Sequence, residues 1–308
     1  MAHTHSHDHH HHNVDSAYNK INLSFAIAVG ANFLFTVIEA GYAIYANSMG
    51  LLADAGHNLG DVLGLLLAWG ASWLMVQPAK DRYSYGYKRS SVLASLLNAF
   101  LLVAASAIIA YESIAKLIHP NSVNEITVIV VAGIGILVNA STAMLFAKGT
   151  NDLNIKGAFL HLMADALLAF GVMAAGIIVY YTGWVRLDPL IGLVIVVVIV
   201  MGTWDLLKQS LRLLLDAAPK HIEPEKVNVF LKALPGVEAV HDLHIWGLST
   251  REVALTAHLV MPNKGLSDDE FHHINDELLE KFSIHHVTLQ VEKAATNRLV
   301  RKMVRVRE

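Results

Sequence analysis

Two His-x-x-x-Asp motifs could bind a metal ion, because each lies inside a long apolar segment of the chain. One motif comprises His57 and Asp61, and the other comprises His161 and Asp165. Residues four positions apart share one face of a helix, so each segment would present an imidazole and a carboxylate on the same side. Two such faces brought together offer two nitrogen and two oxygen ligands, a tetrahedral set suited to zinc.

The repetition of the motif favours metal binding over a structural role. An ionisable group at membrane depth costs about 2.5–3.5 kcal/mol on insertion scales, and a bound cation would offset that cost. One pair is equally well explained by a local hydrogen-bonding need, but two identical pairs in separate segments are not. Ligand sets rich in nitrogen favour zinc and borderline ions, here Cd²⁺, Co²⁺, Ni²⁺ and Fe²⁺, over manganese or magnesium.

Three other polar side chains lie near the motifs in the apolar segments. Asp54 precedes His57 by three positions, and we expect it to support the ligands by hydrogen bonding; a charge at the entrance of the site is the alternative. Asn58 follows His57, and Glu39 lies in the preceding segment. Both either line the path of the ion or hold helices together.

The composition places the chain among membrane proteins. It has 308 residues, of which 54% are hydrophobic and 16% charged, whereas a soluble domain usually carries about 25% charged residues. A membrane span needs about 20 apolar residues, and six segments qualify. The first shows no signal-peptide cleavage site, so we expect it to be retained. The expected spans are 23–45, 49–76, 92–118, 126–146, 159–182 and 189–213, which predict an all-α six-helix transmembrane domain.

Charged residues between the spans predict the orientation. The positive-inside rule places basic loops in the cytoplasm. One side receives only Lys116 and Arg186, so both termini are expected to be cytoplasmic. The other side receives Lys20, Lys80, Arg82, Lys88, Arg89, Lys148, Lys156, Lys208 and Arg212.

Several classes of partner and site are excluded by composition. The chain has no cysteine, which excludes disulfides and thiolate metal sites. Its net charge is −3 and it has no basic patch in sequence, so no nucleic-acid partner is expected. It also lacks the Gly-x-x-x-x-Gly-Lys-Ser/Thr motif, so no nucleotide is expected.

The polar C-terminal third predicts a small α/β domain. Helical patterns at 223–234 and 267–282 alternate with strand patterns at 237–246, 252–261 and 286–292. The order αββαβ would pack both helices on one face of a three-stranded sheet. We expect four regions: a His-rich disordered leader at 1–19, the membrane domain at 20–215, the α/β domain at 216–293 and a basic tail at 294–308.

Four stretches of sequence resemble the cation diffusion facilitators, in particular zinc exporters with a two-His, two-Asp transport site. These stretches are 48–61 (SMGLLADAGHNLGD), 85–89 (YGYKR), 154–165 (NIKGAFLHLMAD) and 240–246 (VHDLHIW), and the resemblance extends from about residue 20 to residue 292. It implies a ferredoxin-like cytoplasmic domain and a Y-shaped homodimer that operates by alternating access coupled to protons.

The resemblance also implies a regulatory zinc site in the cytoplasmic domain. By position, the family's ligand pattern falls on His241, His258, His285 and Glu292, with His286 as the alternative to His285. Some relatives carry a further site between the second and third spans, but residues 77–89 contain no histidine, so we predict none there. The leader has seven histidines in residues 1–12, which would bind metal weakly unless the segment is inert or a purification tag.

The sequence therefore predicts a secondary transporter embedded in the lipid bilayer of the bacterial inner (plasma) membrane. It would export Zn²⁺, the borderline cations being alternative substrates, in exchange for protons. A membrane-embedded metal sensor or metalloenzyme without transport is the alternative. We expect no enzyme, because the chain lacks a His-Glu-x-x-His motif and two His/Asp pairs would close the coordination shell that a catalytic zinc keeps open.

Overall fold

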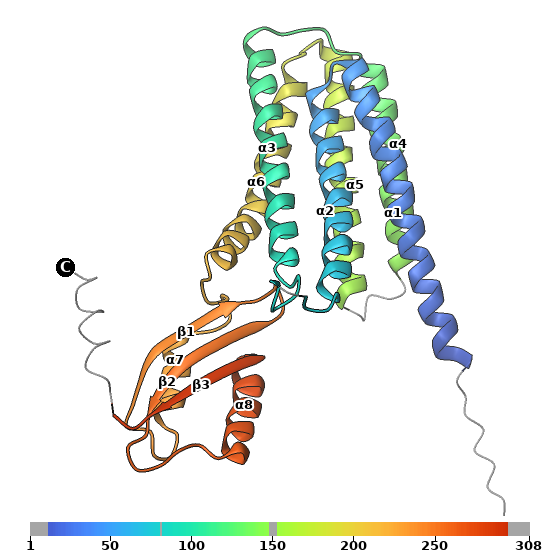
Figure 1. Ribbon diagram of the computed structural model, residues 1–308. Coiled ribbons are helices and arrows are strands. Elements are labelled where there is room, and N and C mark those ends of the chain that lie inside the picture. The colour runs from blue at the N-terminus through green and yellow to red at the C-terminus, as the bar shows by residue number, and fades with distance from the viewer. Residues whose placement is uncertain (1–11, 81, 148–152, 295–308) are drawn as a thin grey trace, which may run out of the picture. The chain divides into compact units, whose positions relative to one another are not determined.

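The computed structural model describes residues 12–80, 82–147 and 153–294. Six long helices come first along the chain (Figure 1). All six are long and apolar enough to cross a membrane, which confirms the predicted six-helix membrane domain. They are α1 (His12–Ala46), α2 (Met49–Met75), α3 (Ser90–Ile118), α4 (Glu125–Phe146), α5 (Leu153–Thr182) and α6 (Leu187–Leu214).

Two helices begin earlier than the apolar segments that predicted them. Helix α1 starts at His12, inside the region expected to be a disordered leader, and α5 starts at Leu153 rather than at residue 159. Neither polar extension contains a proline, so nothing interrupts the helical hydrogen bonds there. Residues 1–11 and 295–308, which hold most of the predicted leader and nearly all of the predicted tail, lie outside the described residues.

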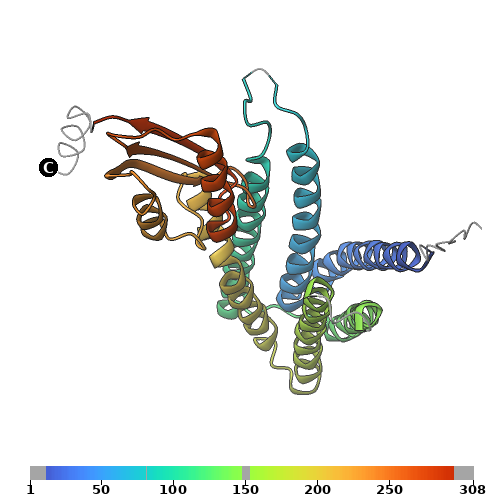
Figure 2. The same ribbon diagram turned by 90° about the horizontal axis from the view of Figure 1, so that it is seen from below.

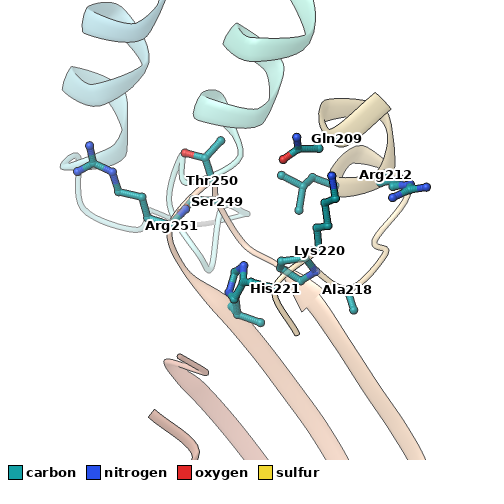
Figure 3. Close-up of a pocket in the computed structure, with 11 residues that line it drawn as sticks. Gln209, Arg212, Ala218, Lys220, His221, Ser249, Thr250 and Arg251 are labelled. Carbon is teal, nitrogen blue, oxygen red and sulfur yellow. The ribbon is translucent and has the colours of Figure 1, made fainter. Parts of the chain in front are cut away.

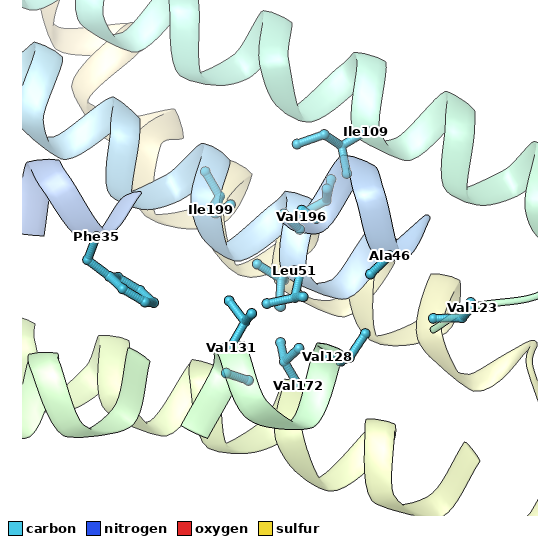
Figure 4. Close-up of a cluster of buried hydrophobic side chains, with 14 of the residues drawn as sticks. Phe35, Ala46, Leu51, Ile109, Val123, Val128, Val131, Val172, Val196 and Ile199 are labelled. Atoms are coloured by element: carbon cyan, nitrogen blue, oxygen red, sulfur yellow. The ribbon is translucent and has the colours of Figure 1, made fainter. Parts of the chain in front are cut away.

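The chain divides into two compact units. One comprises Met1–Leu66 and Phe100–Thr203, and the other comprises Leu67–Ala99 and Trp204–Glu308. The first unit has an apolar core to which all six membrane-capable helices contribute (Figure 4). Helix α4 packs against both α1 and α5 (Figure 2). A Cβ atom added to Gly135 of α4 would lie 3.0 Å from Phe35 of α1, so glycine allows this close approach.

Helix α6 holds the first residues of α2 through one buried carboxylate. Asp188 is 4% exposed and accepts a hydrogen bond from the Ser48 hydroxyl and one of 2.6 Å from the Met49 backbone N–H. The first N–H groups of a helix lack partners within the helix. Asp188 therefore caps α2, the helix that carries His57 and Asp61.

The second unit contains the predicted α/β domain. Its elements are α7 (Pro224–Lys232), β1 (Ala239–Gly247), β2 (Val253–Val260), α8 (Asp268–Phe282) and β3 (His286–Glu292), which confirms the order αββαβ. The sheet order is β1-β2-β3, with β1 antiparallel and β3 parallel to β2. Both helices share one apolar core with alternate residues of β2, including Leu255 and Leu259, so they cover the same face of the sheet.

Helix α8 starts where its sequence predicted a start. Ser267 is the N-cap and forms a reciprocal capping box with Glu270. Hydrogen bonds from Lys264, and from the backbone and side chain of Ser267, lower the pKa of Glu270 to about 2. This cap fixes the crossover between the two parallel strands β2 and β3.

Candidate metal centre

The structure brings the four predicted ligands of the membrane domain together. His57 and Asp61 lie on α2, and His161 and Asp165 lie on α5. The Nε2 atom of His57 is 3.6 Å from Asp61 Oδ2 and 3.5 Å from Asp165 Oδ1. The Nε2 atom of His161 is 3.2 Å from Asp61 Oδ2 and 3.7 Å from Asp165 Oδ2. Each imidazole therefore faces both carboxylates.

His57, Asp61 and Asp165 offer ligand atoms that all lie within 4.8 Å of one another, and His161 Nε2 approaches both carboxylates at similar nitrogen–oxygen separations. Zinc bonds to nitrogen and oxygen of about 2.0–2.2 Å place neighbouring ligand atoms about 3.3–3.6 Å apart. Charge-assisted hydrogen bonds are shorter, about 2.7–2.9 Å. Asp61 Oδ2 and Asp165 Oδ1 are also among the buried polar atoms without a hydrogen-bond partner in the described part of the chain. The geometry thus fits a cation between the four groups better than direct pairing.

The four residues of the candidate site differ in burial. The side chain of Asp165 is 3% exposed, whereas that of His161 is 49% exposed. A buried carboxylate requires a compensating charge, which a bound cation or a protonated imidazole would supply.

The three neighbouring polar residues are buried close to the candidate ligands. Glu39 of α1 and Asp54 of α2 are both 0% exposed, and they interact with each other. Asp54 also interacts electrostatically with Asp165 and His57. The Asn58 side-chain amide donates a hydrogen bond of 3.4 Å to Glu39 Oε2. These residues form a buried polar layer next to the candidate ligands.

A second group of possible ligands lies on the sheet of the C-terminal domain. His241 of β1 and His258 of β2 are direct cross-strand partners, and their ring centroids are 5.0 Å apart. Glu292, at the end of β3, is 3.1 Å from His241 Nε2 and 2.9 Å from His258 Nδ1. All three lie on the sheet face opposite α7 and α8, within reach of one metal ion. Partial burial alone would raise the pKa of Glu292, but hydrogen bonds from the two histidines outweigh it and lower that pKa.

His285 and His286 do not join this cluster within one chain. His286 is the first residue of β3 and pairs with Ala254, whereas Glu292 is the last and pairs with Val260. Seven residues of strand span about 20 Å, so the two histidines lie at the opposite end of the sheet. Of the predicted cytoplasmic ligands, the structure gathers His241, His258 and Glu292 only.

Asp242 is a possible ligand that the sequence did not single out. It has a positive φ of 51° and lies where the β1–β2 register shifts between His241 and His244. This bulge places Asp242 Oδ2 3.7 Å from His258 Nε2 and Oδ1 3.1 Å from His244 Nε2. The sequence signal for this bulge is an aspartate between two histidines of a predicted strand. Asp adopts the left-handed conformation more readily than most residues, so it suits a bulge position.

Comparison with known proteins finds a family match for each of the two domains. The cation efflux transmembrane domain matches residues 25–215. The cytoplasmic domain of cation efflux proteins matches residues 219–294. The chain belongs to the cation efflux family. This membership confirms the resemblance to cation diffusion facilitators and identifies the chain as a metal cation transporter of the membrane, not an enzyme.

Several curated relatives resemble this cation efflux protein over most of their length. The metal cation efflux system protein CzcD of Cupriavidus metallidurans is 34% identical, covering 90% of this chain and 87% of its own. A cadmium, cobalt and zinc/H(+)-K(+) antiporter of Bacillus subtilis is 32% identical, covering 89% of each. The zinc transporter ZitB of Escherichia coli is 31% identical, covering 89% of this chain and 88% of its own.

Proposed function

We propose that this cation efflux protein exports Zn²⁺, with Cd²⁺, Co²⁺, Ni²⁺ or Fe²⁺ as alternative substrates, through a site formed by His57, Asp61, His161 and Asp165. The observation that carries the proposal is the set of four nitrogen–oxygen separations between 3.2 and 3.7 Å. Two imidazoles and two carboxylates suit zinc and borderline cations. The relatives named as zinc transporters or as a cadmium, cobalt and zinc antiporter support the same substrate class.

The same ligands provide a route to proton exchange. An imidazole binds metal only through an unprotonated nitrogen, so zinc and protons compete for His57 and His161. The ordinary pKa of histidine, about 6.5, lies close to physiological pH. Metal binding on the cytoplasmic side would release protons, and protonation on a more acidic outer side would release metal. Alternating access between those two sides completes the exchange. Glu39, Asp54 and Asn58 would support the ligands or line the path.

A flux measurement tests the transport site. The Asp165→Ala variant should lose zinc flux into proteoliposomes, by at least about tenfold, because a buried ligand and its charge are removed. Asp276→Ala is the matched control, since this aspartate is exposed on α8 and should leave flux unchanged. Undiminished flux in Asp165→Ala would refute the site. Zinc binding without flux in the wild type would favour the alternative of a membrane-embedded sensor.

The cluster of His241, His258 and Glu292 is proposed to bind a regulatory zinc ion. Two imidazoles and a carboxylate supply three suitable donors, and Asp242 is placed to assist. In an Asp165→Ala background, zinc at about 100 times its dissociation constant should stabilise the protein by about 2.7 kcal/mol. Adding His258→Ala should abolish that thermal shift, whereas adding His119→Ala, an exposed histidine at the end of α3, should not. An equal shift in both variants would exclude this cluster.

We further propose a homodimer in the bacterial inner membrane with both termini in the cytoplasm. Lys116 and Arg186, the two basic residues assigned to the outer side, both bond to residues at one end of the bundle: Lys116 Nζ to Asn47 O, and Arg186 Nε to Leu117 O. Because the chain has no cysteine, a single Asp276→Cys variant can be probed in intact cells. Labelling by a membrane-impermeant maleimide would contradict the orientation, and a monomeric mass near 33.7 kDa would contradict the dimer.

A further inference from the structure

A basic pocket lies at the junction between α6 and the C-terminal domain. Its volume is about 350 Å³, at the lower end of the range of about 300–1,000 Å³ for small-ligand sites. The end of α6, the segment before α7 and the β1–β2 loop form its walls. Lys220 lies between Arg212 and Arg251 in Figure 3. The polar residues that line it are Gln209, Arg212, Lys220, His221, Ser249, Thr250 and Arg251.

The charge of the pocket lining is uncompensated. No acidic residue lines the pocket, and in the described part of the chain neither Arg212 nor Arg251 has a side-chain ion pair. Lys220 is 3.6 Å from Asp205, but both side chains are more than 60% exposed, and exposed pairs of this kind contribute little. By contrast, the nearby cations Lys88 and Arg89 are paired with Glu252 and Asp216. Among the described residues, Arg212 and Arg251 therefore bring positive charge to the pocket without an ion-pair partner, and only Lys220 has one.

The β1–β2 loop adds hydrogen-bond donors to this charge. The Ser249 hydroxyl oxygen accepts bonds from the backbone N–H groups of Arg251 and Glu252, at 3.1 and 2.9 Å. Its hydroxyl hydrogen is thus free to donate to a ligand, although the residue is only 3% exposed. Guanidinium groups and buried hydroxyls together are the donors that phosphate groups select.

The pocket residues of α6 follow side chains that are typical of a membrane interface. The helix has 28 residues and is about 42 Å long, which exceeds the hydrocarbon thickness of about 30 Å. Trp204 is 48% exposed, and Lys208 Nζ lies 5.3 Å from the centroid of its ring. Such Trp and Lys residues mark the membrane interface, and Gln209 and Arg212 follow one or two turns later. Leu213 and Val253 add apolar walls beside the cations.

We propose that this pocket binds a phosphate group, carried by an anionic lipid headgroup or free in solution. Basic pockets at the ends of membrane helices bind such headgroups through the same donors. Arg212 and Arg251 lie on opposite sides of the pocket in Figure 3, so their long side chains would turn inwards to hold a phosphodiester, with Ser249 donating from the β1–β2 loop. A bound lipid would thereby tie the end of α6 to the sheet of the C-terminal domain.

Native mass spectrometry of the purified full-length protein tests the proposal. Dioleoylphosphatidylglycerol should bind more tightly than dioleoylphosphatidylcholine, which has the same chains and no net charge. The double variant Arg212→Gln/Arg251→Gln should weaken phosphatidylglycerol binding about thirtyfold, since each basic residue near the surface contributes about fivefold. Lys232→Gln, an exposed cation at the end of α7, is the matched control. The Arg212→Lys/Arg251→Lys variant should retain most of the binding, which separates charge from structural damage.

A calorimetric titration with inorganic phosphate distinguishes a lipid headgroup from free phosphate as the ligand. Saturable phosphate binding that is lost in the double glutamine variant, without preference for phosphatidylglycerol, would assign the pocket to free phosphate. If both probes bind the double variant as tightly as the wild type, the proposal is wrong. Arg251→Gln alone, on an exposed loop, should still weaken binding about fivefold if the double variant does not fold.

Discussion

At the scale of single residues, the proposed transport site depends on the balance of nitrogen and oxygen donors. Each imidazole faces both carboxylates, so the four residues form one cluster rather than two separate pairs. His161 is the most exposed of the four. It can therefore be changed with little effect on packing, and its chemistry can be tested separately from the fold.

The His161→Asp variant should shift the preference of the site towards harder cations. Replacing one nitrogen ligand with a carboxylate oxygen favours manganese relative to zinc, and we expect the zinc-to-manganese affinity ratio to fall by about tenfold or more. Competition calorimetry on the purified protein measures this ratio. His119→Asp introduces the same charge at an exposed position at the end of α3 and should leave the ratio unchanged. An unaltered ratio in His161→Asp would mean that His161 is not a ligand.

The sequence predicts each His/Asp pair of the membrane domain because the relation within a pair is local, whereas the cytoplasmic cluster depends on strand direction. Four-residue spacing alone puts His57 and Asp61 on one helix face. In the sheet, the direction of β3 decides which end meets His258. Since β3 runs parallel to β2, Glu292 lies near that histidine and His286 does not. No pattern within β3 contains this information, so the sequence alone does not show that His285 and His286 lie away from His258 within one chain.

At the scale of elements, apolar runs predict which helices exist but not where they begin. An apolar run marks only the part of a helix that would lie in the hydrocarbon core. The helix itself continues until its backbone hydrogen bonds end. Helices α1 and α5 thus extend into polar sequence beyond the predicted spans. The buried role of Asp188 was likewise invisible, because it lies in a predicted connection, next to residue 189. Its partners Ser48 and Met49 are about 140 residues away in sequence.

The Asp188→Ala variant should destabilise the joint between α2 and α6. It removes the acceptor for the Met49 N–H and the Ser48 hydroxyl in a buried environment, which costs about 1–3 kcal/mol. Thermal unfolding of the protein in detergent should show a lower midpoint. Asp205→Ala on the same helix removes an exposed carboxylate, 63% accessible, and should change the midpoint little. Equal midpoints for Asp188→Ala and the wild type would show that this cap contributes nothing.

At the scale of the whole molecule, six membrane-capable helices and one αββαβ domain account for nearly the full chain. Both halves match one family in their sequence order. This order joins a helical domain with one cluster of candidate ligands to an α/β domain with another. Metal could therefore be sensed by the same chain that exports it. The choice of counter-ion depends on the whole protein, because it depends on which side of the membrane each conformation opens the metal site to.

We expect protons to be the counter-ion that drives zinc transport. The Bacillus subtilis relative is named for both H(+) and K(+), whereas competition at His57 and His161 requires protons only. Zinc uptake into proteoliposomes with an acidic lumen should therefore keep its initial rate when choline replaces potassium on both sides. Concentrative uptake should disappear when the two pH values are equal, and Asp165→Ala proteoliposomes set the background. A requirement for potassium in the lumen would show that proton competition at the two histidines is not sufficient to drive export.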